Sequence, residues 1–579
     1  MMSNKESSPV GIVLTMAIGI FLCILDTTVM NIALPAIQTG LSTDLAHLSW
    51  ALNIYTVLFA SLTIPLGRIA DIFGRARLYI IGLIVFVLGS LASGLAVNDM
   101  TLIIGRGVQS IGAAIVFPAS MTIGIKSVSM NKRNTAIAML GITQGLAAAL
   151  GPTIGGVVTQ FFSWRGIFLI NVPFILLSLI LCIKLLDLNE SHHKTEKIDF
   201  SGSLFSKITL FSLTLLLVKG SDWGWTSAKI LGLITICIGA LIIFILVESR
   251  VAQPMIPLAL FKDKQFVGSA IATVSSGMFL AALLVLMPSF FTKVQNKTEL
   301  IAALMITPAS FMIFVWSPIS GVLLSKLGPK IVTVTGNVMM ILGYVTLSTM
   351  NPNIYWQVFI AALLIGAGYG IVIGPITVLA AGDFTGDLLT ASQSVIGVFR
   401  QIGTSLAVAI FVSALSTNLI TAKSNVWHYA KTEVTALDIS PKAKRDTLAQ
   451  VRKQLASEKT PKKKQTVFIN EKEKQHLINK NYQLAIKKNK LAIAPKNVKQ
   501  AVFKQVKEEV TTEVDHSNKV LAVTVANIKN KTKKELTSAF IHPYQFALPF
   551  TFLMLLTVFL FKKRKVYLKQ ILAEEKIEP

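Results

Sequence analysis

The chain has 579 residues, of which 53% are hydrophobic and only 15% charged, and its mean hydropathy is +0.64. This composition excludes a soluble globular domain, because apolar runs of about 18 residues or more recur along the chain. The net charge of +26 is misleading, since residues 421–543 alone supply 26 Lys and Arg against 11 Asp and Glu. We expect that hydrophilic segment to meet an anionic envelope polymer or lipid headgroups rather than nucleic acid.

About fourteen apolar runs are long enough to cross the roughly 30 Å hydrocarbon layer as helices. The seventh of them is the shortest. In chain order the runs span 10–34, 49–70, 78–97, 101–124, 135–160, 166–186, 204–219, 228–247, 266–291, 301–325, 331–349, 355–380, 391–418 and 544–562. The sequence therefore predicts an all-α polytopic membrane protein.

Lysines and arginines in the short loops set the orientation, because cytoplasmic loops are enriched in them. With the N-terminus inside, the short outer loops hold only Arg165, Lys219, Lys293 and Lys297. The inner loops and the tail hold Arg68, Arg75, Arg77, Lys126, Lys132, Arg133, Arg250, Lys262, Lys264, Lys326, Lys330, Lys562, Lys563, Arg564 and Lys565. We expect both termini to be cytoplasmic, and the first run to stay as an uncleaved anchor. Segment 421–543 lies outside in this topology, since long loops translocate largely regardless of charge.

The runs divide into two sets of six around the pair 204–219 and 228–247. The stretch Pro318 to Lys330 at the end of run ten resembles a degenerate copy of Pro65 to Arg75 at the end of run two. Such an echo in matching positions is what a duplicated six-helix bundle predicts. We expect five parts: an N-terminal bundle at 1–190, an inserted helix pair with its inner loop at 191–263, a C-terminal bundle at 264–420 with 544–562, the outer loop at 421–543 and a cytoplasmic tail at 563–579.

The outer loop carries two apolar repeats of helical period. Leucines recur every seven residues at 477, 484 and 491, and valines recur every four residues from Val498 to Val514. We expect two amphipathic helices that fold back on one another or lie on the rest of the outer surface. The alternative is a lysine-rich solvated segment with marginal helicity.

A short motif ends the second apolar run and begins the third. Its spacing is Gly-x-x-x-Asp-x-x-Gly-Arg-x-Arg, with the residues Gly67, Asp71, Gly74, Arg75 and Arg77. Glycines allow helix ends to approach closely, the aspartate can pair with an arginine or cap a helix, and arginines hold the loop in the cytoplasm. The motif resembles the signature loop of the major facilitator superfamily of secondary transporters. The resemblance implies the major facilitator fold and alternating access.

The first run contains Leu25-Asp-Thr-Thr-Val-Met-Asn-Ile-Ala-Leu-Pro35, which resembles the first-helix motif of the fourteen-helix drug:proton antiporters of that superfamily. Asp26 lies deep in an apolar helix, where an ionised carboxylate must be paired or face a water-filled cavity, or else be protonated. We therefore expect Asp26 to take up and release a proton. The alternative is a carboxylate that only packs against a neighbouring helix. Asn31 of the same motif is a candidate for the substrate cavity.

The fourth run contains Arg106, Gln109, Ser110 and Gly112, which resemble the superfamily's fourth-helix motif with a serine in place of its first glycine. A buried arginine keeps its charge and needs acceptors. The resemblance implies that Arg106 lies near Asp26 and biases its affinity for protons. The alternative is a structural arginine bonded to backbone carbonyls.

The fifth run contains Gly151, Pro152, Gly155 and Gly156, which resemble the antiporter motif of drug exporters. Glycines at helical spacing make a smooth face for close packing, and the proline permits a bend. Run thirteen adds Arg400 and Gln401, two polar residues at membrane depth that are candidates for the substrate cavity. Runs nine to twelve lack Asp and Glu, which argues for neutral or monocationic substrates.

These motifs lead us to expect proton-coupled export of lipophilic, amphipathic drugs or cations across a bacterial plasma membrane by a monomer in contact with membrane lipid. We expect no enzyme activity and no cofactor. We also expect no metal site, because the three cysteines all fall inside apolar runs and no Cys/His ligand pattern is visible. One alternative is a dedicated exporter of one solute or lipid. Another is a membrane-anchored protein that binds a partner through its outer loop.

The topology is tested by a cysteine at Lys488 in a background without Cys23, Cys182 and Cys237. We expect a membrane-impermeant thiol reagent to label the variant Lys488→Cys on whole cells, because the loop is outside. Labelling that occurs only after lysis would place the loop in the cytoplasm.

Overall fold

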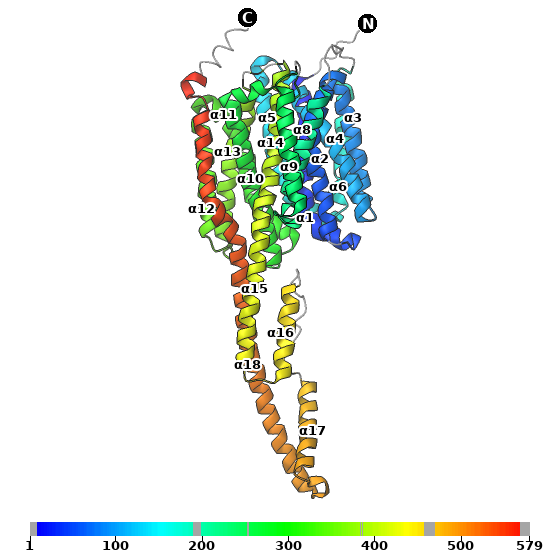
Figure 1. Cartoon of the computed structure of the whole chain (residues 1–579), viewed down its shortest axis with the longest axis vertical. Coiled ribbons are helices and arrows are strands. Elements are labelled where there is room, and N and C mark those ends of the chain that lie inside the picture. Colours follow the sequence, from blue (N-terminus) through cyan, green and yellow to red (C-terminus); the bar gives the residue numbers. More distant parts are fainter. Residues whose placement is uncertain are drawn as a thin grey trace. The chain divides into compact units, whose positions relative to one another are not determined.

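The computed structural model describes residues 8–567 apart from 44, 189–198, 252–253, 383, 385, 457–468 and 470. The described residues form helices joined by turns and contain no strand, and fourteen of these helices are long and apolar enough to cross a membrane (Figure 1). The predicted all-α membrane fold is confirmed. The last part of the predicted tail, residues 568–579, lies outside the described residues.

The chain forms two compact units. Unit 1 comprises residues 1–292, 297–414 and 543–579, and unit 2 comprises residues 293–296 and 415–542.

The first six membrane crossings form the N-terminal half of unit 1. Their helices are α1 (Pro9–Leu41), α2 (Leu45–Phe73), α3 (Arg75–Gly94), α4 (Asp99–Lys126), α5 (Met130–Phe162), α6 (Gly166–Leu169) and α7 (Asn171–Leu185). Local sequence sets several of their ends. Asn98 and Thr101 form a reciprocal capping box at the start of α4. Gly74 joins α2 to α3 with a φ of 106°, a backbone conformation that favours glycine.

The inserted pair consists of α8 (Phe200–Trp223) and α9 (Ala228–Glu248). Helix α8 extends beyond the seventh apolar run, which was predicted at 204–219. The helix begins at Phe200 because the side chain of Asp199 caps it by accepting a hydrogen bond from the Gly202 amide. Lys219 is buried near the end of α8, where it bonds Asp222 and the Ser49 hydroxyl, each at 2.8 Å. The second of these bonds joins the inserted pair to α2.

The C-terminal half of unit 1 begins after the turn η1 (Leu258–Lys262). Its helices are α10 (Lys264–Lys293), α11 (Glu299–Leu327), α12 (Pro329–Thr349), α13 (Tyr355–Ala381) and α14 (Gly386–Ala407), followed by the π turn η2 (Val408–Val412). The last membrane crossing is the end of α18 (Lys496–Leu553) with η4 (Met554–Leu560). The final run was predicted to begin at residue 544, whereas the helix that contains it begins at Lys496.

The two halves repeat one packing scheme and meet along a shared interface. Helix α3 packs against α4 in the first half, and α12 packs against α13 in the second. Across the interface, α5 packs against α11 and α13, and α14 packs against α2 and α4. Rings from four elements of the second half form an aromatic cluster, with Tyr344 lying 4.9 Å from Phe279 and 5.8 Å from Tyr544 between ring centroids. This cluster fastens the last crossing to the C-terminal bundle.

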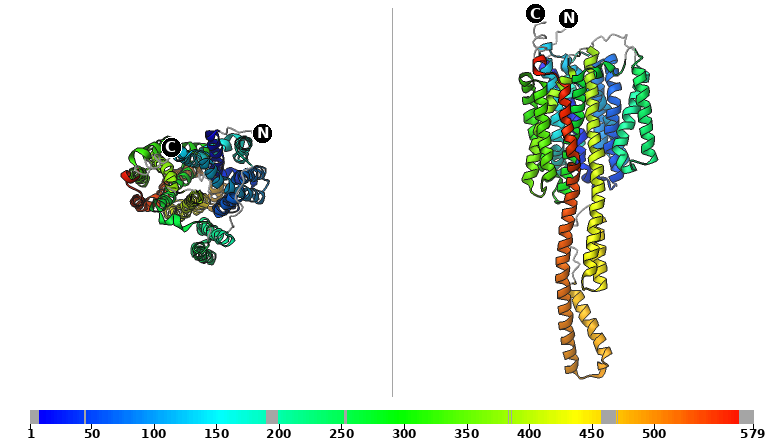
Figure 2. Two further views of the ribbon diagram at one scale, coloured as in Figure 1. Left: turned by 90° about the horizontal axis from the view of Figure 1, so that it is seen from above. Right: turned by 60° about the vertical axis from the view of Figure 1, so that its left-hand side comes forward.

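Unit 2 is a set of helices with two small apolar cores. It contains most of α15 (Ser413–Ala436), α16 (Pro441–Ala456), α17 (Glu471–Lys488), η3 (Leu491–Ile493) and the first part of α18. Helix α17 runs alongside α18 (Figure 2), and Ile478 of α17 packs with Val510 and Val514 of α18. A second cluster joins α15, α16 and α18.

The apolar repeats of this segment predict its helices only in part. Two helices were predicted where the described residues contain parts of four. The valine repeat marks the buried face of α18, since Val510 and Val514 are buried. The leucine repeat does not mark the buried face of α17. Leu484 is 55% exposed and Leu491 lies beyond the end of α17 at Lys488, whereas Ile478 is buried.

The packing of α17 on α18 is tested by placing a carboxylate in the core. In Val510→Asp the charge would be buried without a partner, so we expect α17 to unfold locally and its amides to exchange about ten-fold faster or more. The measurement is hydrogen exchange by mass spectrometry on the full chain in detergent. The control Leu484→Asp adds the same charge at an exposed position. Equal exchange in both variants would contradict the packing.

Candidate functional site

Asp26 lies in the middle of α1 and is only 4% exposed. It is the single charged residue of that 33-residue helix. One carboxylate oxygen, Oδ1, accepts hydrogen bonds from Gln109 Nε2 at 2.9 Å and from Asn171 Nδ2 at 3.3 Å. The other oxygen, Oδ2, accepts a hydrogen bond from the guanidinium of Arg106. Three side chains from α4 and α7 thus converge on one buried carboxylate.

Arg106 is 1% exposed and contacts hydrogen-bond acceptors and an aromatic ring. Its Nε donates to the Ala51 carbonyl at 3.2 Å, and its Nη1 donates to Gln109 Oε1 at 2.8 Å as well as to Asp26. The guanidinium carbon lies 4.2 Å from the centroid of the Tyr55 ring. The ring adds a cation–π interaction to this buried site. The Nε and Nη1 groups of Arg106 are therefore both hydrogen-bonded in this arrangement.

Ser90 of α3 and Tyr55 of α2 complete the network. The Ser90 hydroxyl accepts from Gln109 Nε2 at 2.8 Å and from Asn171 Nδ2 at 3.2 Å. The Tyr55 hydroxyl donates to the Cys23 carbonyl of α1 at 2.9 Å. Five helices of the N-terminal half therefore contribute to one polar cluster in an otherwise apolar bundle.

Glycine makes the close helix packing around this cluster possible. A Cβ added at Gly112 of α4 would lie 2.4 Å from the Phe86 amide nitrogen of α3. A Cβ at Gly89 of α3 would lie 2.2 Å from the Gln109 nitrogen. Only glycine fits at either position, so these residues fix how closely Ser90 and Gln109 approach.

The cluster matches the ionised form of Asp26. Arg106, Gln109 and Asn171 all present N–H donors to the carboxylate. A protonated carboxyl carries an O–H donor of its own, which would face another donor in this arrangement. A proton on Asp26 would therefore require at least one partner to withdraw or to turn an amide oxygen toward the carboxyl.

The residues of the loop motif lie together between α2 and α3. Asp71 pairs with Arg75, whose Nε donates to Oδ1 at 2.6 Å, and lies 3.9 Å from Arg68. Arg77 donates from Nε to the Leu188 carbonyl at 2.7 Å, after the end of α7. Gly67 lies one helical turn before Asp71. A Cβ at Gly67 would lie 3.3 Å from Pro118 of α4 and 3.4 Å from the Ser394 hydroxyl of α14, so this glycine is at the interface of the halves.

The glycines of α5 face two directions. A Cβ at Gly151 or Gly155 would collide with Thr28 or with the Val29 carbonyl of α1, at 1.8 Å and 2.8 Å respectively. A Cβ at Gly156 would lie 3.1 Å from the Ala303 side chain of α11, in the other half. Pro152 is buried within the helix between these positions.

The predicted cavity residues do not join the Asp26 cluster. Arg400 and Gln401 lie in α14 and are each 5% exposed. Among the described residues, Arg400 Nε, Nη1 and Nη2 and Gln401 Nε2 have no hydrogen-bond partner. Asn31 is exposed and lies five residues after Asp26, hence on another face of α1.

Sequence reasoning missed Tyr55, Ser90 and Asn171 as members of the site. Asn171 carried a usable signal, since an amide at the depth of an apolar run is rare and usually faces the bundle interior. Ser90 and Tyr55 carried none, because single serines and tyrosines occur throughout the apolar runs.

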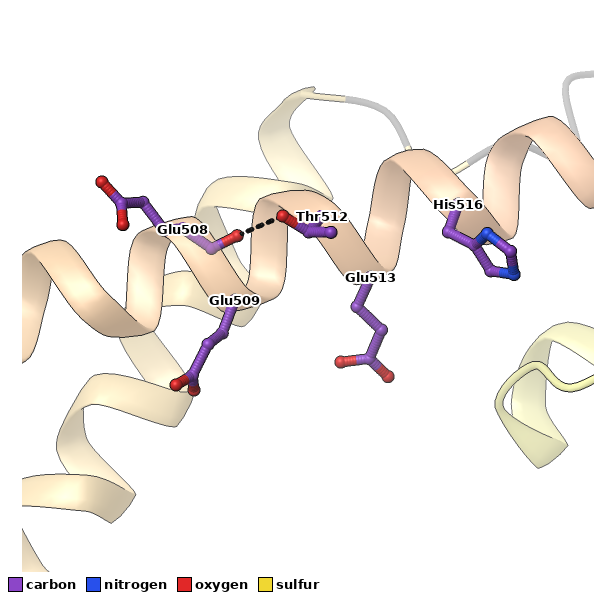
Figure 3. Close-up of a pocket in the computed structure, with 5 residues that line it drawn as sticks. All are labelled: Glu508, Glu509, Thr512, Glu513 and His516. Atoms are coloured by element: carbon purple, nitrogen blue, oxygen red, sulfur yellow. Dashed lines mark hydrogen bonds between the residues drawn. The ribbon is translucent and has the colours of Figure 1, made fainter.

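A hollow on unit 2 is lined by Glu508, Glu509, Thr512, Glu513 and His516, all from α18 (Figure 3). The Thr512 hydroxyl donates to the backbone carbonyl of Glu508 at 2.9 Å. The side chain of Glu508 points away from those of Glu509 and Glu513. These groups come from one helix and do not converge, so we assign no binding site to the hollow.

Comparison with known proteins places this geometry in a family. Residues 16–408 match the family model of the Major Facilitator Superfamily. The chain is 29% identical to the multidrug resistance protein Stp of Mycobacterium tuberculosis over 408 residues, which is 69% of this chain and 74% of that protein. It is 30% identical to the multidrug transporter protein MdtP of Bacillus subtilis over 429 residues, 72% of this chain and 78% of the relative.

A third relative is the methylenomycin A resistance protein of Bacillus subtilis. The identity is 29% over 443 residues, which cover 73% of this chain and 90% of the relative. The family match includes α1 to α5 with all three motifs around Asp26, Arg106 and Gly151, and it extends through α14. The chain belongs to the major facilitator superfamily.

Proposed function

We propose that this protein exports small lipophilic, amphipathic compounds from the cell in exchange for protons, by alternating access. The observation that carries the proposal is the buried Asp26–Arg106 pair with its donors from Gln109 and Asn171. Two of the three relatives are named for resistance to drugs or to methylenomycin A, and the third is named a multidrug transporter protein. Fourteen helices of the described residues are long and apolar enough to cross a membrane, and the family match supports a transporter rather than an enzyme.

The proton reaches Asp26 from outside and neutralises it. Because all three side-chain partners of the carboxylate are donors, the neutral form loosens its bond to Arg106. Arg106 then keeps only the Ala51 carbonyl and Gln109 Oε1 as acceptors. An arginine that is left short of acceptors in a dry site is unstable. Proton release to the cytoplasm restores the pair and resets the cycle.

The contacts between the two halves are the ones that change in the proposed cycle. Near the outer end of α5, Gly156 meets Ala303, and the Thr153 and Thr307 hydroxyls bond each other at 2.9 Å. Near the inner ends, Gly67 meets Ser394 and Arg133 donates to the Phe384 carbonyl. Alternating access breaks one of these sets of contacts while the other holds.

Loss of the ionisable group tests the proposal. We expect Asp26→Asn to abolish proton-driven efflux in proteoliposomes, because an amide of the same size takes up no proton. The measurement is efflux of a panel of neutral, cationic and anionic lipophilic dyes under an imposed proton gradient. Asp99→Asn is the control, since Asp99 lies at the start of α4 among solvent-accessible groups, and we expect it to retain efflux.

Wild-type rates in the Asp26→Asn protein would refute proton coupling through this residue. Export of a single compound from the whole dye panel would favour the dedicated exporter over the multidrug exporter.

The outer contact of α5 with α11 is tested by Gly156→Leu. The larger side chain cannot lie 3.1 Å from Ala303, so the outer contact cannot close, and we expect efflux to fall about ten-fold or more at normal expression. The control is Gly239→Leu on α9, where an added Cβ meets no atom within 4 Å. Efflux that is equally preserved in both variants would contradict the role of this contact.

A further inference from the structure

Arg400 is the most anomalous side chain of the C-terminal half. It is 5% exposed, and none of its three guanidinium nitrogens has a hydrogen-bond partner among the described residues. Arginine does not give up its proton in proteins, so this charge persists in the apolar interior. A buried charge without a partner is costly and is retained only where something else compensates it.

The membrane-spanning parts of the second half contain no acid that could pair with Arg400. The sequence has no acid from residue 264 to 298, from 300 to 382 or from 388 to 432, which covers the membrane-spanning parts of α10 to α14. Asp26, the buried acid of the other half, is already bonded to Arg106, Gln109 and Asn171. The interior of the second half therefore carries an unbalanced positive charge.

Arg400 lies close to the interface of the halves. Helix α14, which carries Arg400, packs against α13, which carries Tyr369. The Tyr369 ring in turn lies 3.7 Å from the position that a Cβ of Gly145 would take on α5, in the N-terminal half. One turn before Arg400, a Cβ on Gly397 would lie 2.5 Å from the Phe117 ring of α4. The charge is thus adjacent to surfaces that separate when a transporter of this fold changes state.

Other buried polar groups without hydrogen-bond partners, and space not filled by side chains, lie on the same helix as Arg400 and on the helix packed against it. On α14, Gln401 Nε2 and the Ser405 hydroxyl are buried and have no partner among the described residues. On α10, the Val274 backbone lies 2.6 Å from the position of a Cβ on Gly403. One turn further along α10, a Cβ on buried Gly277 would meet no atom within 4 Å. The bundle is therefore not filled next to the α10–α14 contact.

We propose that Arg400 binds the anionic oxygen group of the exported compound, and that the substrates include lipophilic carboxylates. The inference rests on the proposed export function and adds to it a substrate class. A guanidinium pairs with a carboxylate through two parallel hydrogen bonds, and the pair is strong in a dry site. Gln401 Nε2 and Ser405 Oγ are donors that suit the same group.

This proposal revises the expectation of neutral or monocationic substrates. The absence of acids from runs nine to twelve excludes strong binding of a dication, but it leaves Arg400 uncompensated. A compound with an apolar body and one carboxylate supplies the missing charge and fills apolar space. The apolar body also suits the composition of α13, where Tyr369 is followed by Ile371, Val372 and Ile373.

The test compares two fluorescent probes that differ only in charge. Dansylundecanoate carries a free carboxylate, and its methyl ester does not. We expect the full-length protein, in phosphatidylcholine nanodiscs without anionic lipid, to bind the carboxylate about ten-fold more tightly than the ester, as a charge-assisted hydrogen bond allows. Arg400→Gln should weaken binding of the carboxylate by about the same factor and leave the ester within about two-fold. Arg250→Gln, an exposed charge on the loop after α9, should change neither.

Several outcomes overturn the proposal. If the ester binds wild-type protein as tightly as the carboxylate does, the proposal is wrong. This outcome is decisive even if Arg400→Gln fails to fold. Equal loss of both probes in Arg400→Gln assigns the residue a structural role instead. The export function is judged separately, because Asp26→Asn should stop proton-driven efflux without changing the ratio of the two binding constants.

Discussion

The N-terminal half is organised around one constraint, which is that a carboxylate inside a membrane bundle must have partners. Asp26 meets it with Arg106, Gln109 and Asn171, and Ser90 then satisfies the remaining protons of the two amides. These contacts draw α1, α3, α4 and α7 together. The glycines at 89 and 112 are required because larger residues would push α3 and α4 apart and break the cluster.

Each half contains a buried arginine, and the two arginines differ in their hydrogen-bond acceptors. Arg106 has a carboxylate, an amide oxygen, a carbonyl and an aromatic ring around it. Arg400 has none of these hydrogen-bond acceptors among the described residues. The proposed roles divide in the same way, with proton uptake at Asp26 in one half and an anion site at Arg400 in the other. The paired arginine stabilises one arrangement of its neighbouring helices, whereas the unpaired arginine is the group proposed to bind a ligand.

The sequence predicts most of the architecture and the centre of the site, because membrane helices are long apolar runs and charges within them are rare. Asp26, Arg106 and Gln109 were identifiable for that reason. Ser90 and Tyr55 were not, since their role depends on which helices are neighbours. On α17 the leucine repeat failed because the helix ends at Lys488, before Leu491. Its core position is Ile478, one residue after Leu477, and a seven-residue period drifts around a straight helix.

The packing between the halves explains why charge can govern the movement. Gly156 with Ala303 and Gly67 with Ser394 are contacts between small residues, and lipid tails are as apolar as the side chains that they replace. Separating these apolar contacts therefore costs less than breaking the polar bonds beside them, between Thr153 and Thr307 and from Arg133 to the Phe384 carbonyl. The expensive changes are electrostatic, because Asp26, Arg106 and Arg400 lie where water does not compensate them. In the proposed cycle, the state of the protein depends on which of these three charges is neutralised. A proton would do so at Asp26, and an anionic substrate would do so at Arg400.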